Sequence, residues 1–257
     1  MNAKQTWTAL WTIIVREVRR FMRIWPQTLL PPSITMTMYF IIFGNLIGSR
    51  VGEMEGVPYM SYIVPGLIMM SVITNSYSNV ASSFFSNKFQ RSVEELIVSP
   101  MPNWVIMMGF VIGGVARGLG VGIIVTAVSL FFTHLDVQHP LLTIAVVIMT
   151  AVLFSIGGFI NSLLANKFDD ISIVPIFVLT PLTYLGGVFY SISMLPEFWQ
   201  HVSLINPILY MVNTFRYGIL GISDINVTLA FAAIAAFIIV FYCFGLWLLK
   251  RGKGLRS

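Results

Sequence analysis

The stretch Val227–Leu249 reads VTLAFAAIAAFIIVFYCFGLWLL and contains no charged residue. A helix needs about 20 consecutive apolar residues to cross a bilayer, so this stretch predicts a membrane-spanning helix. The rest of the chain agrees, because 57% of the 257 residues are hydrophobic and 10% are charged. A water-soluble domain has about a quarter of its residues charged, and the composition therefore excludes that class.

Other apolar segments come before this stretch, and each is long enough to cross a bilayer. The chain is thus predicted to be an all-α integral membrane protein with six transmembrane helices. Pro31 and Pro32 should interrupt the helix where the first span begins. The earlier segments cover about residues 29–47, 59–85, 104–132, 140–164 and 171–192.

Residues 1–25 predict an amphipathic helix that lies in the membrane interface, with tryptophan on one face and arginine on the other. No apolar core precedes the arginines, so a signal peptide is not expected. A soluble helix packed on a partner is the alternative. The apolar face would hold Trp7, Leu10, Trp11, Ile14, Val18, Phe21, Met22 and Trp25, and the polar face Thr12, Arg16, Arg19, Arg20 and Arg23.

Residues 194–223, between the fifth and sixth segments, are partly apolar and are interrupted by Pro196, Pro207, Gly218 and Gly221. These breaks are too frequent for one span. We therefore expect an external re-entrant helical hairpin, whose backbone must be buried in protein or must line a cavity.

Lysine and arginine are concentrated on one side of the predicted spans. Arg50 and Arg216 fall on the other side, and Arg117 falls inside the third segment. Because positive residues are retained on the cytoplasmic side, both termini are predicted to be cytoplasmic. The cytoplasmic set comprises Lys4, Arg16, Arg19, Arg20, Arg23, Lys88, Arg91, Lys167, Lys250, Arg251, Lys253 and Arg256.

The sequence offers little for catalysis or metal binding. It contains no phosphate-binding loop, HExxH, GxSxG or CxxC motif, and its one cysteine, Cys243, cannot form a disulfide within the chain. His134, Asp136 and His139 are interpreted as a solvated external turn. We expect no metal, no cofactor and no enzymatic activity of the chain by itself. The net charge of +5 is dispersed between apolar runs, so nucleic acid is not an expected partner.

The cytoplasmic connection 86–103, between the second and third spans, is short, amphipathic and rich in charge. Residues 88–100 read KFQRSVEELIVSP, and Pro102 follows. A solvated connection between two helices is one interpretation of this segment. A docking helix for a cytoplasmic partner is the other.

Several of these motifs resemble the ABC type-2 transporter permease family. Residues 91–100, RSVEELIVSP, are similar to its coupling segment. Later motifs occur in the family's order, and the likeness covers residues 1–257 as a single domain. These motifs are Leu185-Gly-Gly-Val-Phe-Tyr190, Leu195-Pro196, Asn206-Pro207 and Phe215-Arg216-Tyr217-Gly218.

The resemblance implies a permease subunit of a bacterial inner-membrane exporter, surrounded by membrane lipid. Two permease copies, expected as a homodimer, would work with two separate ATPase subunits that bind ATP and Mg²⁺ and drive substrate outward. The residues expected to couple the permease to the ATPase are Phe89, Arg91, Glu94, Glu95 and Leu96.

A polar stripe on the second span consists of Ser71, Asn75, Ser78, Asn79, Ser82 and Ser86. Such groups either pack helices together or line a pathway. The resemblance implies a pathway formed by the second and fifth spans. The candidate pathway residues are Asn75, Asn79, Thr180 and Tyr184.

Two arginines are candidates for a functional charge. Arg117 lies about 20 Å along its span at 1.5 Å per residue, without an acidic residue in the spans to pair with it. It must find carbonyls, water, a lipid phosphate or a substrate anion, or else extend to the interface. Arg216 lies in the external segment. A membrane-embedded lipid-handling protein or enzyme acting alone, and a secondary transporter, are the alternative functions. The secondary transporter would need an intramembrane carboxylate.

Overall fold

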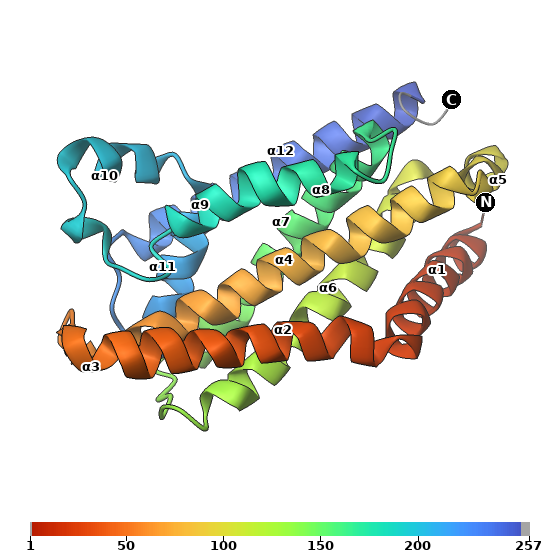
Figure 1. Ribbon diagram of the computed structural model, residues 1–257. Helices are drawn as coiled ribbons and strands as arrows, with labels where there is room; N and C mark the ends of the chain where they lie inside the picture. The colour runs from red at the N-terminus through yellow and green to blue at the C-terminus, as the bar shows by residue number, and fades with distance from the viewer. Residues whose placement is uncertain (1, 253–257) are drawn as a thin grey trace.

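The computed structural model describes residues 2–252, and almost all of them are helical (Figure 1). The start of α1 (Ala3–Arg23) and the end of α12 (Val227–Arg251) lie at the same end of the helical bundle as α5 (Ser92–Val98). The hairpin that follows α3 (Gly48–Val51), and α10 (Glu197–Leu204), lie at the opposite end. Lys253 and Arg256, which belong to the predicted cytoplasmic set, lie outside the described residues.

The amphipathic N-terminal helix is α1, Ala3–Arg23. It crosses the end of the bundle at an angle and packs against α6 (Figure 1). Its inward stripe consists of Leu10, Ile13, Glu17 and Phe21. Trp7 and Trp11 remain exposed, as expected for an interfacial helix. Part of the predicted apolar face is therefore buried against the protein, and part of it is exposed.

The first apolar segment is helical from Trp25 to Val51, so the predicted interruption at Pro31 and Pro32 is wrong. The chain instead bends at Ile24, between α1 and α2. Proline is tolerated within membrane helices because serine, threonine and neighbouring helices compensate the lost hydrogen bond. The segment comprises α2 (Trp25–Tyr39), the π-helix η1 (Phe40–Ile47) and α3 (Gly48–Val51).

The central helix is α4, Tyr59–Phe89. A small antiparallel hairpin, β1 (Glu53–Met54) with β2 (Val57–Pro58), leads into it from α3. Most of α4 is buried, because it packs against several helices at once. These neighbours are α6 (Asn103–Ser129), α7 (Pro140–Leu164) and α11 (Pro207–Leu220).

The remaining elements flank this core. The fifth predicted span is helical over α8 (Asp170–Val174), η2 (Pro175–Leu179) and α9 (Thr180–Tyr184), and it ends eight residues before the predicted limit at 192. The short helix α5 covers Ser92–Val98, and α12 covers Val227–Arg251. A 3₁₀ turn, η3 (Ile192–Met194), leads to α10.

The segment predicted to be a hairpin contains two short helices, α10 (Glu197–Leu204) and α11. Asn206 joins them, and its side-chain Oδ1 accepts a hydrogen bond of 3.0 Å from the Ile208 N–H. Its amide Nδ2 donates to the Leu182 carbonyl at the end of the fifth segment. The Asn-Pro motif therefore caps α11 and fixes it to α9.

Within residues 2–252, four helices are long and apolar enough to cross a membrane. The prediction of an all-helical integral membrane protein is thus confirmed. The central helix α4 has 31 residues, but its serines and asparagines lower its hydropathy, and the fifth segment is shorter. The four helices are Trp25–Val51, Asn103–Ser129, Pro140–Leu164 and Val227–Arg251.

Candidate functional site

The predicted coupling segment forms a sharp elbow between α4 and α5. Arg91 has a left-handed backbone with φ of 61°, which is uncommon for a residue other than glycine. The Ser92 hydroxyl donates a hydrogen bond of 3.0 Å to the Asn87 carbonyl across this turn. Glu94 and Glu95 lie in the first turn of α5, where their negative charge interacts favourably with the helix dipole. The elbow therefore has a defined geometry.

The structure separates the predicted coupling residues into two groups. Phe89, Arg91, Glu94 and Glu95 are exposed at the end of the bundle, and Phe89 is 66% exposed. Leu96 instead packs into the apolar cluster beneath α1 and is only partly accessible. Leu96 is therefore less accessible to a partner than the other four residues.

Two exposed apolar side chains that the sequence reasoning missed belong to the same surface. Val98 is 86% exposed, and the Phe168 ring lies 5.1 Å from the Phe89 ring, centroid to centroid. The Lys88 ammonium donates to the Leu163 and Ala165 carbonyls at the end of α7. The α7–α8 loop is thereby fixed to the end of α4. We call Phe89, Glu94, Glu95, Val98 and Phe168 the α5 surface.

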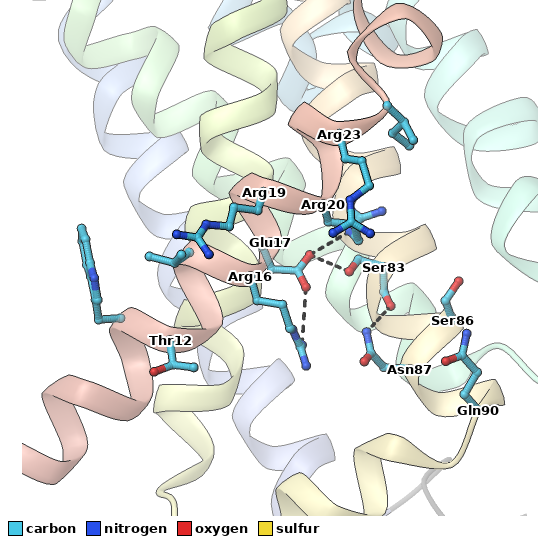
Figure 2. A pocket seen from close by; sticks show the side chains of 13 residues that line it. Thr12, Arg16, Glu17, Arg19, Arg20, Arg23, Ser83, Ser86, Asn87 and Gln90 are labelled. Atoms are coloured by element: carbon cyan, nitrogen blue, oxygen red, sulfur yellow. Dashed lines mark hydrogen bonds and ion pairs between the residues drawn. The ribbon is translucent and has the colours of Figure 1, made fainter.

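A buried ionic group lies beside this surface, between α1 and α4 (Figure 2). The Glu17 side chain is 1% exposed, and its carboxylate accepts hydrogen bonds from Arg16 at 3.4 Å and Arg20 at 3.3 Å. The Ser83 hydroxyl of α4 also donates to it. A buried carboxylate needs such partners, because desolvation without them is costly. This group joins the N-terminal helix to the central helix.

Sequence reasoning missed Glu17 because it lies among arginines assigned to the polar face. The available signal was its spacing, since Leu10, Ile13, Glu17 and Phe21 follow the three- and four-residue repeat of one face. Opposite it on α6, a Cβ added to Gly113 would lie 2.6 Å from the Cβ of Glu17. Close approach of α1 to α6 therefore requires glycine there.

The predicted pathway residues do not lie together. Asn79 is completely buried, and its Oδ1 accepts a 2.7 Å hydrogen bond from Arg20 of α1. Asn75 is also buried and bonds to Arg117 of α6 at 3.3 Å. Thr180 and Tyr184 are exposed on the outer side of the fifth segment. Both asparagines thus hold helices together within one chain.

A different part of the polar stripe faces the fifth segment. Ser78 and Ser82 of α4 are partly exposed, and they line a cavity of about 330 Å³ with Ser172 and Ile176. These serines lie on the edge of the stripe that faces the fifth segment. Among the polar residues of α4, these two serines could share one surface with Thr180 and Tyr184 of the fifth segment.

We expect Asn79→Leu to destabilise the protein. The substitution removes the acceptor of the Arg20 hydrogen bond, and a bond to a charged group of this kind contributes about 1.5–3 kcal/mol. Thermal unfolding in detergent should show a lower midpoint. Ser78→Leu is the matched control, and its midpoint should stay near that of the wild type. Equal midpoints for both variants would contradict a structural role for Asn79.

The two candidate arginines are both held inside the protein. Arg117 donates to Asn75 through Nη2, so it has found a polar partner on α4. Arg216 is completely buried within α11, in the segment predicted to be re-entrant. Its Nη2 donates a 2.6 Å hydrogen bond to the Gly187 carbonyl, and its Nε donates to the Tyr62 carbonyl at 3.3 Å. Its guanidinium also lies 3.9 Å from the Tyr62 ring centroid.

The sequence of this chain is similar to those of known proteins. The E. coli K12 protein "inner membrane transport permease YadH" is 61% identical to this chain over 251 residues, which cover 98% of both chains. Nodulation protein J of Rhizobium meliloti (strain 1021) is 24% identical over 248 residues, covering 95% of this chain and 93% of that protein. The ABC-2 type transporter family matches residues 8–220. The chain therefore belongs to the ABC-2 type transporter permease family, as its motifs predicted.

Proposed function

We propose that this chain is an inner-membrane permease that forms a homodimer and uses ATP hydrolysis by two copies of a separate ATPase to move a substrate outward. As a permease of this family, the chain is the transmembrane component and not the ATPase. The ATP and Mg²⁺ of the transporter would be bound by the partner subunit.

The observation that carries this proposal is the α5 surface. It combines the two exposed carboxylates of α5 with exposed apolar side chains of α4, α5 and the α7–α8 loop, and Lys88 fixes this loop to the end of α4. Exposed apolar groups gathered around charges are typical of protein–protein contact sites. An ATPase that pulls on α5 would move α4, the helix with the most extensive packing in the bundle.

Six spans result when α4 and the fifth segment are added to the four long apolar helices. At 1.5 Å per residue, the 31 residues of α4 extend about 46 Å, which exceeds the hydrocarbon thickness of about 30 Å. Residues 170–184 form an apolar helix that the connection to η3 would complete. With both segments included, the two termini lie on one side of the membrane.

An exposed apolar face on the fifth segment supports a dimer. Ile173, Ile176, Phe177 and Tyr184 are all exposed on it. A second permease copy placed against this face would enclose Ser78 and Ser82 of α4, together with Thr180, between the two chains. The pathway would then follow the dimer contact.

The proposal is tested by affinity purification of the tagged full-length permease from native membranes in mild detergent. An ATPase subunit should co-purify, and the mass of the complex should correspond to two permeases and two ATPases. A permease recovered without an ATPase, with substrate transport intact, would favour the lipid-handling protein or secondary transporter acting alone.

Single cysteines should report the orientation of the chain. In a Cys243→Ser background, cysteines at Glu53 and Asp136 should react with an impermeant maleimide added outside, and one at Asn166 should not. All three positions are exposed, and Asn166 directly follows Ala165, whose carbonyl accepts a hydrogen bond from Lys88 at the end of α4 that leads to α5. Labelling limited to Asn166 would reverse the orientation.

A further inference from the structure

A pocket of about 770 Å³ lies between α1 and the end of α4 (Figure 2). Its walls are basic and polar on the side of the Glu17 group. Arg16, Arg19, Arg20 and Arg23 line it from α1, and Ser83, Ser86, Asn87 and Gln90 line it from α4.

The positive charge of this pocket is only partly neutralised. Glu17 is the one acidic residue that lines it, and its carboxylate is shared by Arg16 and Arg20. Within residues 2–252, Arg19 and Arg23 form no ion pair. Both side chains are exposed beside the hollow, so they are free to meet an anion. A concave basic wall concentrates negative ligands.

The remaining wall is apolar and consists of Trp11, Val15 and Ile24. Trp11 is exposed, and tryptophan favours the level of lipid headgroups. A ligand that satisfies both walls needs an anionic head and an apolar body. Guanidinium groups bind phosphate oxygens in a bidentate manner, which makes phosphate the anion that suits four arginines.

We propose that this pocket binds the phosphate group of an anionic amphiphile, such as a phospholipid of the leaflet nearest the termini. Arg19 and Arg23 would supply the charge that Glu17 leaves uncompensated, and the acyl chains would pass along Trp11 and Ile24. Basic pockets between membrane helices bind lipid headgroups in the same way. The inference does not depend on the ATPase or on the direction of transport.

The place of the pocket gives its ligand a means to act on coupling. Gln90 lines the pocket and directly precedes Arg91, the residue at which the chain turns into α5. A bound headgroup would therefore bridge α1 and the root of the elbow. The occupied pocket should stiffen the segment that carries the α5 surface.

The test uses the purified full-length permease in detergent and radiolabelled phosphatidylglycerol, with binding measured by scintillation proximity. Unlabelled phosphatidylglycerol should displace the label at a concentration at least about tenfold below that of phosphatidylcholine. Arg19→Gln with Arg23→Gln should weaken binding about 30-fold, which corresponds to about 1 kcal/mol for each arginine near an anionic headgroup. Lys250→Gln with Arg251→Gln, which removes the same charge at the end of α12, should change the affinity less than about twofold.

Competition with inorganic phosphate at millimolar concentration distinguishes a site for the phosphate group alone from a site for a lipid headgroup. Displacement of the label by phosphate supports a site that recognises the phosphate group alone. A label that resists phosphate but yields to phosphatidylglycerol supports a lipid headgroup site. Equal displacement by the two lipids overturns the proposal. Wild-type affinity of the Arg19 and Arg23 variant, or an equal loss in the control pair, does so as well. Both double variants should elute as folded monodisperse protein, since all four side chains are exposed.

Discussion

Permease carrying Glu94→Lys together with Glu95→Lys is expected to lose its ATPase during purification and to lose transport. Both carboxylates are exposed on α5 and carry no ion pair within residues 2–252, so they are available to a partner. Loss of one member of a charge pair buried in an interface costs about 2–5 kcal/mol, chiefly through faster dissociation. Reversal of two charges should therefore weaken the complex by a factor of about 30 or more.

The permease itself should remain folded, because neither carboxylate packs against the bundle. Its yield and its thermal unfolding midpoint in detergent are the checks. The matched control is Glu53→Lys with Glu55→Lys, which changes the same charge on an exposed hairpin at the opposite end of the bundle. Complex recovery and transport that equal the wild type in the α5 variant would remove this surface from the coupling role.

Replacement of Arg216 by alanine should produce the largest loss of stability. The substitution leaves the Tyr62 and Gly187 carbonyls without this donor and opens a cavity beside the Tyr62 ring. Cavity formation and an unpaired buried acceptor together cost about 3–5 kcal/mol. The thermal unfolding midpoint in detergent should fall sharply, and less of the protein should reach the membrane.

Arg216→Lys and Arg50→Ala complete this experiment. Lysine keeps the charge but lacks the planar guanidinium group that donates to both carbonyls. It should therefore recover only part of the stability. Arg50 is exposed at the end of α3, and its replacement should change stability by less than about 0.5 kcal/mol. An Arg216→Ala midpoint equal to that of Arg50→Ala would contradict the structural role of the buried guanidinium.

Local pattern was sufficient for much of the architecture. Long apolar runs predicted helices 140–164 and 227–249 to within two residues of α7 and α12, because a chain in lipid must satisfy its backbone hydrogen bonds within each helix. A short helix within residues 86–103 and the two short helices after residue 194 were also expected, since charge clusters, prolines and glycines limit helices locally. The predicted helix break at Pro31 and Pro32 was wrong, because membrane helices tolerate proline.

The sequence by itself determined the class of protein, most of its helices, its family and the position of the short charged segment between the second and third spans. Only the tertiary structure decided what the polar side chains do. Asn79 bonds to Arg20, Glu17 is buried beneath arginines, and Arg216 joins the motif at 215–218 to Gly187 in the motif at 185–190. These partners are distant in sequence, and helical periodicity gives the face of a residue without the neighbour opposite it. The neighbour follows from how the helices pack, and packing depends on the shapes of all of them at once.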